Sequence, residues 1–242
     1  MYLQASFRDG KSVAEGDFVL QLRRVYPIIA ELSSEDQTLG GPWYLSSGGD
    51  DGKLGVPVFD GVQLNPVCIE ELIRRSQHES GQPKSIDIWN GNPGRGNAAT
   101  LSIIIDCGSI ANQFELSVSE KQKKESRLGM YQSSAKVVSM VANKFCCSYV
   151  AFGPRHYFEK QVFDDRLGVS WMLYLPHVLT SNEVPEACDL IPVVRDGKQQ
   201  GTIIVSVTDA VFDVDNPEHV KVANAIEIRL ADQDLLPRYI DL

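Results

Sequence analysis

The dipeptide Asp196-Gly197 lies between two runs of apolar and β-branched residues, 190–195 and 202–208. Two-residue hairpin turns favour aspartate followed by glycine, because both central residues of a type I′ turn need positive φ. The flanking runs contain valine, isoleucine and threonine, which are enriched in strands. These residues therefore predict a β-hairpin and, with it, an antiparallel sheet in the last third of the chain.

Short runs of the same kind, bounded by glycine, proline, asparagine or aspartate, recur along the chain and predict further strands. They cover residues 2–8, 43–45, 56–59, 85–89, 100–106, 113–118 and 169–175. Three tryptophans fall in or at the edge of these runs, and we expect their rings to be largely buried. They are Trp43, Trp89 and Trp171.

Three or four helices are expected beside these strands. The first has an apolar stripe at the 3.6-residue period. The stripe consists of Phe18, Leu22, Val25, Ile29 and Leu32. Pro27 should kink this helix or end it near Val25, because proline removes an N–H donor and crowds the preceding turn. The charged segment 120–127 is predicted to open another helix that runs to about Phe145.

Two further helices are predicted to begin at Asn65-Pro66 and Asn216-Pro217, because asparagine is a good N-cap and proline suits the first helical position. Their expected buried residues are Ile69, Leu72 and Ile73 in the first helix, and Val220, Ala223, Ile226 and Leu230 in the second. We also expect Leu236, Tyr239 and Ile240 to dock the C-terminal tail on the body. The whole pattern predicts a single α+β domain over residues 1–242, with mainly antiparallel sheet and three to four packed helices.

One pattern occurs twice in the chain. Val58-Phe59-Asp60 precedes Asn65-Pro66, and Val211-Phe212-Asp213 precedes Asn216-Pro217, each with a tryptophan-containing strand upstream. The repeat indicates a tandem duplication of a strand-helix unit, with internal halves 1–118 and 119–242. The alternative is that the chain uses a good helix start twice.

Residues with catalytic or metal-binding chemistry are scattered. The four histidines form no His-Glu-x-x-His pair and the five cysteines form no Cys-x-x-Cys pair, so we expect no metal and no cofactor. Cys107 follows an expected strand, where a nucleophile could lie, but no local histidine accompanies it as a base. The hydrolase motif Gly-x-Ser-x-Gly does not occur. We therefore expect a protein that is not an enzyme.

The charge of the chain is strongly negative. The formal net charge is −9, of which residues 206–242 supply −5 through eight carboxylates and three cations. Such a charge repels nucleic acid and anionic membranes and attracts basic proteins. Stabilisation of helix N-termini explains only part of this excess. The candidate partner-binding carboxylates lie on expected turns and at a helix start: Asp50, Asp51, Asp164, Asp165, Asp209, Asp213, Asp215 and Glu218.

Several segments together resemble those of a known family. They are the N-terminal strand and helix, Gly-Gly-Pro-Trp-Tyr-Leu at 40–45, Pro-Val-Phe-Asp at 57–60 and Leu-Gly-Val-Ser-Trp at 167–171. Over nearly its full length the chain resembles bacterial polymorphic-toxin immunity proteins of the immunity protein 52 family. These motifs are structural, and the family brings no catalytic residues to assign. The resemblance implies a protein that neutralises a restriction-endonuclease-like toxin delivered by type VI secretion.

The expected mechanism is stoichiometric inhibition of a basic nuclease domain by an acidic cytoplasmic protein. The N-terminus lacks the basic and apolar regions of a signal peptide, and the apolar runs are shorter than a membrane span. Two alternatives stay open: an enzyme of hydrolase type with a dispersed site, and a structural or adaptor protein.

Overall fold

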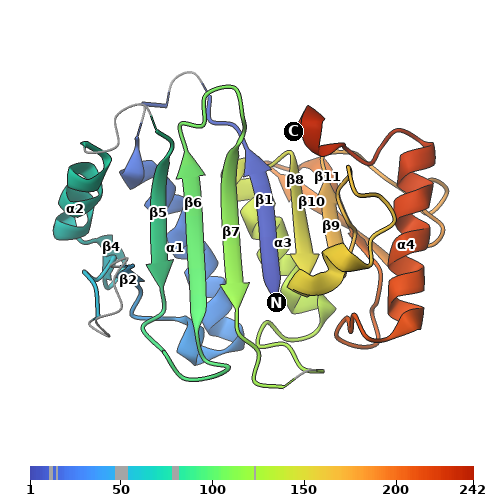
Figure 1. Cartoon of the computed structure of the whole chain (residues 1–242), viewed down its shortest axis with the longest axis horizontal. Coiled ribbons are helices and arrows are strands. Elements are labelled where there is room, and N and C mark those ends of the chain that lie inside the picture. Colours follow the sequence, from blue (N-terminus) through green and yellow to red (C-terminus); the bar gives the residue numbers. More distant parts are fainter. Residues whose placement is uncertain (11–12, 15, 47–53, 78–81, 123) are drawn as a thin grey trace.

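The computed structural model describes residues 1–10, 13–14, 16–46, 54–77, 82–122 and 124–242. These residues form a nine-stranded antiparallel sheet in the order β10-β11-β9-β8-β1-β7-β6-β5-β2, a small β3–β4 hairpin and four α-helices (Figure 1). The α+β fold with mainly antiparallel sheet is therefore confirmed. The strands of the large sheet are β1 (Tyr2–Phe7), β2 (Tyr44–Leu45), β5 (Lys84–Trp89), β6 (Ala99–Ile105), β7 (Asn112–Val118), β8 (Tyr149–Gly153), β9 (Met172–Leu175), β10 (Asp189–Arg195) and β11 (Lys198–Val205).

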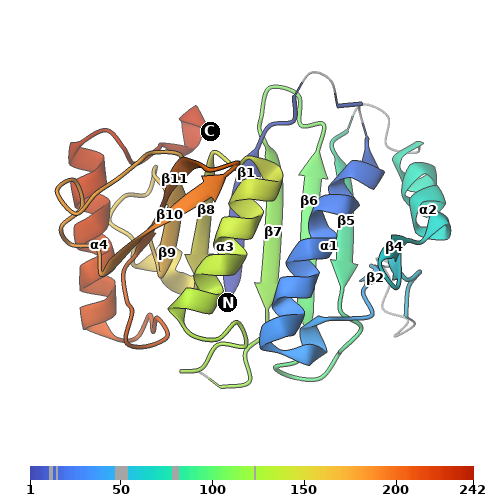
Figure 2. The same ribbon diagram turned by 180° about the vertical axis from the view of Figure 1, so that it is seen from behind.

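The remaining elements surround this sheet. The hairpin consists of β3 (Phe59–Asp60) and β4 (Gln63–Leu64), and the helices are α1 (Phe18–Glu35), α2 (Pro66–Gln77), α3 (Tyr131–Phe145) and α4 (Pro217–Asp232). Three short 3-10 helices are η1 (Gln37–Leu39), η2 (Arg155–Glu159) and η3 (Tyr239–Asp241). Helices α1 and α3 lie side by side behind the sheet in Figure 1 and in front of it in Figure 2.

Two apolar clusters hold these layers together. The larger one joins alternate residues of the central strands, such as Leu101 and Phe114, to apolar residues of α1 and α3 such as Leu22 and Val138. The second cluster lies at the other end of the sheet and includes Ile226 of α4. Helix α4 therefore packs on the β9–β11 region, whereas α1 and α3 cover one face of the central strands.

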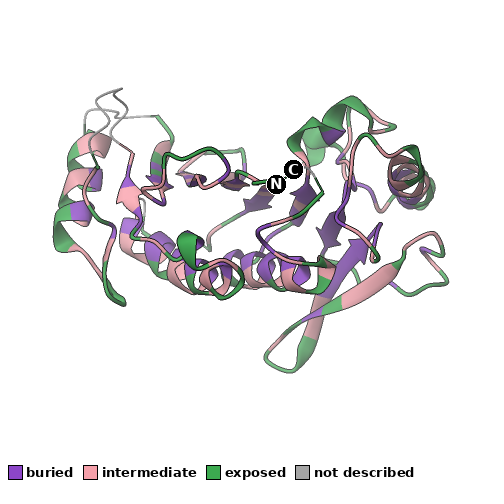
Figure 3. Ribbon diagram, turned by 90° about the horizontal axis from the view of Figure 1, so that it is seen from below, coloured by how far each residue is buried: buried purple, intermediate pink, exposed green. Residues whose placement is uncertain are grey.

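The β10–β11 hairpin confirms the strongest turn prediction. Asp196 and Gly197 have φ of 52° and 73°, the left-handed values that the turn requires. The hairpin has a register shift between Val193 and Val194. Figure 3 shows this hairpin extending from the body on the side of the sheet that α1 and α3 cover. A groove between β10 and α3 results.

Pro27 was expected to kink helix α1 or to end it near Val25. The helix does not end there but continues to Glu35. The Asp17 carboxylate caps its start by accepting a hydrogen bond from the Leu20 N–H at 2.8 Å. Buried residues on both sides of the proline, among them Val25 and Ile28, keep the helix on the sheet. The tertiary packing thus outweighs the cost of one missing hydrogen bond.

The prediction of a helix over 120–127 is wrong, because α3 begins only at Tyr131. Arg127 is buried and binds groups far away in the sequence: its Nε donates to Asp36 at 2.8 Å and its Nη2 donates to the Thr38 hydroxyl at 2.7 Å. Glu120 accepts a hydrogen bond from the Arg127 N–H at 2.8 Å. These contacts hold residues 120–122 and 124–127 in turns and irregular backbone, although their composition suits a helix.

Both Asn-Pro helix starts are confirmed. The side chains of Asn65 and Asn216 accept hydrogen bonds from the N–H groups of Val67 and Glu218, at 3.0 and 3.1 Å. The expected burial of Ile73 is wrong, because its side chain is 44% exposed. Helix α2 buries Cys68 and Leu72, and α4 buries Ala223, Ile226 and Leu230.

The tryptophans and the tail follow the predictions in part. Trp43 and Trp171 are buried, whereas Trp89 is only partly buried. In the tail Leu236 is buried, and Tyr239, although 48% exposed, contacts the body through its N–H, which donates to the Asp165 carbonyl at 2.9 Å. The expected docking of Ile240 is wrong, because this residue is 88% exposed.

The two stretches that share a sequence pattern have different surroundings. Val58-Phe59-Asp60 leads into the β3–β4 hairpin, whereas residues 211–213 form no strand. In addition, α2 precedes three strands of the large sheet, whereas no strand follows α4 in the chain. The tandem duplication and the division at residue 118 stay predictions.

Candidate functional site

Four of the predicted carboxylates lie around the start of α4, and we call them the α4 acidic loop: Asp209, Asp213, Asp215 and Glu218. Asp209, Asp215 and Glu218 are exposed, and Asp213 is partly buried. The Asp213 carboxylate accepts the N–H of Asp215 at 3.0 Å, and the Asp213 N–H donates to Nδ1 of His219 at 3.0 Å. Internal hydrogen bonds therefore shape the loop, while three of its carboxylates lie at the surface.

Asp164 and Asp165 lie in another place. Both are exposed, and the Asp165 carboxylate is 3.7 Å from Nε of Arg238. The Asp165 carbonyl accepts the N–H of Tyr239 at 2.9 Å, which ties this pair to the chain that follows α4. The structure thus places the two acidic groups near opposite ends of α4 and does not join them into one site. Asp50 and Asp51 lie outside the described residues.

A hollow of about 460 Å³ lies beside the α4 acidic loop. Its lining includes Asp213 and Asp215 together with Glu120 and Glu159, which the sequence analysis did not select. Glu120 follows β7 and Glu159 ends η2, so only the folded chain brings them to this place. The Glu120 carboxylate already accepts hydrogen bonds from the Arg127 N–H and the Ser126 hydroxyl, so it has fewer acceptor positions left for a partner.

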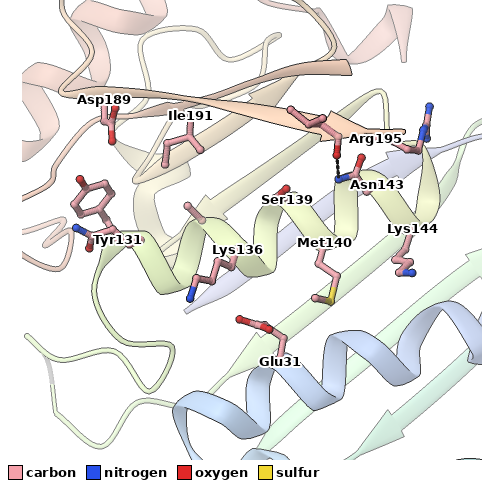
Figure 4. A pocket seen from close by; sticks show the side chains of 13 residues that line it. Glu31, Tyr131, Lys136, Ser139, Met140, Asn143, Lys144, Asp189, Ile191 and Arg195 are labelled. Atoms are coloured by element: carbon pink, nitrogen blue, oxygen red, sulfur yellow. Dashed lines mark hydrogen bonds between the residues drawn. The ribbon is translucent and has the colours of Figure 1, made fainter. Parts of the chain in front are cut away.

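A larger hollow, of about 680 Å³, is the groove between α3 and β10 (Figure 4). Helix α3 supplies one wall and β10 the other, and Asn143 bridges them by donating to the Val194 carbonyl at 3.2 Å. The charged lining residues are the cations Lys136, Lys144 and Arg195 and the carboxylates Glu31 and Asp189. The groove is therefore mixed in charge, with a small positive excess.

A comparison of the sequence with protein-family models identifies the family of this chain. The model of immunity protein 52 matches residues 60–238, well over half of the chain. The chain belongs to the immunity protein 52 family. Membership implies that the protein neutralises a cognate toxin, and immunity proteins of this kind are typically not enzymes. A comparison with curated proteins gave no match.

The residues weighed as catalytic fit this immunity protein role. Burial and the neighbouring Asp106 raise the pKa of the Cys107 thiol, whereas a nucleophilic cysteine needs a lowered pKa. His219 accepts a backbone hydrogen bond at the start of α4, which is a structural contact. The groove has a volume typical of small-molecule sites, yet its lining contains neither histidine nor cysteine.

Two absences hold for the described part of this immunity protein. No group of three or more histidine, cysteine, aspartate or glutamate side chains is arranged to hold a metal ion there. Among the helices in the described ranges, none is both long and apolar enough to span a membrane.

Proposed function

We propose that this immunity protein neutralises a nuclease toxin delivered by type VI secretion, by binding it one to one and covering its nucleic-acid-binding surface. The observation that supports this proposal is the exposed carboxylates near both ends of α4. They belong to a chain that has a net charge of −9 and is a member of a toxin-neutralising family. A nuclease must be basic where it binds the phosphate backbone. An acidic protein is the natural complement of such a surface, and the two would meet in the cytoplasm.

The carboxylates of the α4 acidic loop and the pair Asp164 and Asp165 are proposed to attract the toxin. Exposed charges at the edge of an interface mainly accelerate association, whereas buried contacts determine the lifetime of the complex. Reversing these charges should therefore lower the association rate and its dependence on salt more than it raises the dissociation rate. Asp50 and Asp51 stay predicted contacts of the same kind.

Three double variants of equal charge change test this role. Asp209→Lys with Glu218→Lys changes one end of α4, and Asp164→Lys with Asp165→Lys changes the other. Asp60→Lys with Glu70→Lys is the matched control, because both residues are exposed and lie far from α4 on the β3–β4 hairpin and on α2.

The measurement is the association rate with the purified toxin domain of the neighbouring gene, as an inactive variant, at several salt concentrations. We expect the first two variants to slow association by about tenfold at low salt and the control to have a much smaller effect. Equal rates for all three variants would show that overall charge, and not these carboxylates, attracts the toxin. Failure of the wild-type protein to bind any nuclease toxin would overturn the proposal itself.

A further inference from the structure

One face of the central sheet carries no helix. Helices α1 and α3 both lie behind β5, β6, β7 and β1 in Figure 1, and α4 lies beyond β9 at the edge of the view. Burial alternates along these strands accordingly: in β6, Leu101, Ile103 and Ile105 are buried, whereas Thr100 is exposed and Ser102 is partly exposed. We call the outward side chains of these strands the open sheet face: Ser85, Asp87, Trp89, Thr100, Ser102, Ile104, Gln113, Glu115, Ser117, Tyr2 and Gln4.

The strand register gives this face an acidic centre. Asp87 pairs with Ser102, Ser102 with Glu115, and Glu115 with Gln4, so one row across four strands carries two carboxylates. No lysine or arginine belongs to the open sheet face. Arg155 of η2 lies over the β1 edge of the face, with its guanidinium 4.4 Å from the centre of the Tyr2 ring, so the negative charge is partly balanced at that edge.

Hydroxyl groups hold these two carboxylates in place. Asp87 accepts hydrogen bonds from the hydroxyls of Ser102 at 2.6 Å and Ser85 at 2.8 Å. Glu115 accepts one from the Tyr2 hydroxyl, and burial together with this carboxylate raises the pKa of Tyr2 to about 12. Neutral donors orient a carboxylate without cancelling its charge. The row is thus ordered and still negative.

Exposed apolar side chains border the face on the β8 side, and we call them the apolar rim: Phe158 of η2 with Tyr239 and Ile240 of η3. Their side chains are 62%, 48% and 88% exposed. Phe158 and Tyr239 line a hollow of about 190 Å³ together with Tyr2 and Gln4, so the rim is continuous with the open sheet face. Exposed aromatic side chains beside a polar surface are typical of the residues that dominate binding energy in protein interfaces.

The open sheet face supplies about half of the area that each partner buries in a standard interface. Four strands about 4.8 Å apart and about six residues long cover roughly 300–400 Å². The rim and the neighbouring Asp164 and Asp165 extend this area towards the roughly 800 Å² per partner of a standard interface.

We infer that the open sheet face with its apolar rim is the surface on which the toxin docks, an inference that rests on the proposed function. The toxin is expected to set basic side chains on Asp87 and Glu115 and apolar ones against Phe158 and Tyr239. The α4 acidic loop then attracts the toxin from outside this contact.

Charge distinguishes this surface from its competitors. A second copy of the chain would place carboxylates against carboxylates at the centre of the same face, which costs energy. The α3–β10 groove carries three cations against two carboxylates and so opposes a basic partner. The open sheet face is the surface whose charge and exposed aromatics both fit a basic protein.

The test compares dissociation constants for the inactive toxin domain of the neighbouring gene. One variant combines Asp87→Lys with Glu115→Lys, and a second is Phe158→Ala, whose parent side chain is too exposed to support the fold. The control is Val194→Lys in the groove, a residue that is 50% exposed. Thermal unfolding of each variant confirms that it folds, and hydrogen exchange of the wild-type complex maps the contact independently.

We expect the dissociation constant to rise at least tenfold for both variants and to stay unchanged for the control. In the complex, amides of β5, β6 and β7 and of η2 should exchange more slowly. If the wild-type protein binds the toxin and both variants bind it equally well, the inference is wrong while the proposed function stands. A dimer of this chain that Asp87→Lys dissociates would also overturn it, because the face would then belong to a second copy. Absence of wild-type binding would remove both proposals.

Discussion

Glu227 lies fully buried on α4 and connects that helix to the loop that carries Asp164 and Asp165. Its carboxylate accepts three hydrogen bonds: from the Tyr157 hydroxyl at 2.6 Å, the Val162 N–H at 2.7 Å and the Val169 N–H at 2.9 Å. Burial raises the pKa of Glu227, and the three hydrogen bonds oppose that shift. One buried side chain therefore positions one acidic pair and the η2 part of the apolar rim.

We expect Glu227→Ala to lower the free energy of unfolding by about 2–4 kcal/mol, because two buried donors, the Tyr157 hydroxyl and the Val169 N–H, and the partly buried Val162 N–H lose their acceptor. Glu227→Gln keeps an acceptor oxygen and should cost less. Because folding raises the pKa of Glu227, the stabilisation from its protonated form is complete below the ordinary carboxyl pKa and is lost as pH rises through the raised value. Glutamine does not titrate, so the stability of the wild type relative to Glu227→Gln should fall as pH rises above the ordinary carboxyl pKa of 4.5.

Urea unfolding of both proteins at a series of pH values measures the difference. A constant difference between them would mean that folding does not raise the pKa of Glu227. The sequence could not predict this role, because Tyr157, Val162 and Val169 are far from Glu227 in the chain. The sequence did indicate that most of the candidate partner-binding carboxylates are exposed, because they lie on turns and turns lie at the surface.

At the scale of elements, the sequence predicted correctly the helix starts and the turn whose structure depends on neighbouring residues. The Asn-Pro helix starts and the Asp196-Gly197 turn depend on neighbouring residues, and all three are confirmed. The helix expected over 120–127 failed because Arg127 binds Asp36 and Thr38, about ninety residues away. Burial would raise the pKa of Asp36, but hydrogen bonds from Arg127 and Thr38 outweigh it and hold that pKa well below its usual range.

Two glycines of the β10–β11 hairpin separate backbone conformation from packing. Gly197 has φ of 73° and open space where a Cβ would lie, so Gly197→Ala should cost only the strain of positive φ, about 1 kcal/mol. At Gly201 a Cβ would collide with the Leu175 carbonyl of the paired strand, so Gly201→Ala should cost about 2–4 kcal/mol. Thermal or urea unfolding measures both, and a larger loss for Gly197→Ala would contradict this explanation.

At the scale of the molecule, the order of the strands determines the candidate surfaces. β1 pairs with both β7 and β8, contacts that span more than a hundred residues, and no local pattern predicts such pairing. The row of Asp87 and Glu115 exists only in this register, which explains why the sequence analysis selected neither residue. The exposure of acids on turns is predictable from the sequence, whereas the open sheet face depends on which face the helices leave uncovered.

A titration of toxin activity tests neutralisation by stoichiometric binding most directly. The active toxin domain is held at a fixed concentration well above the expected dissociation constant, and its nuclease activity is measured as the immunity protein is added. We predict that activity falls in proportion to the added protein and reaches zero at a one-to-one ratio. Complete loss at a small fraction of one equivalent would indicate a catalytic mechanism, and full activity at a large excess would contradict neutralisation of a nuclease.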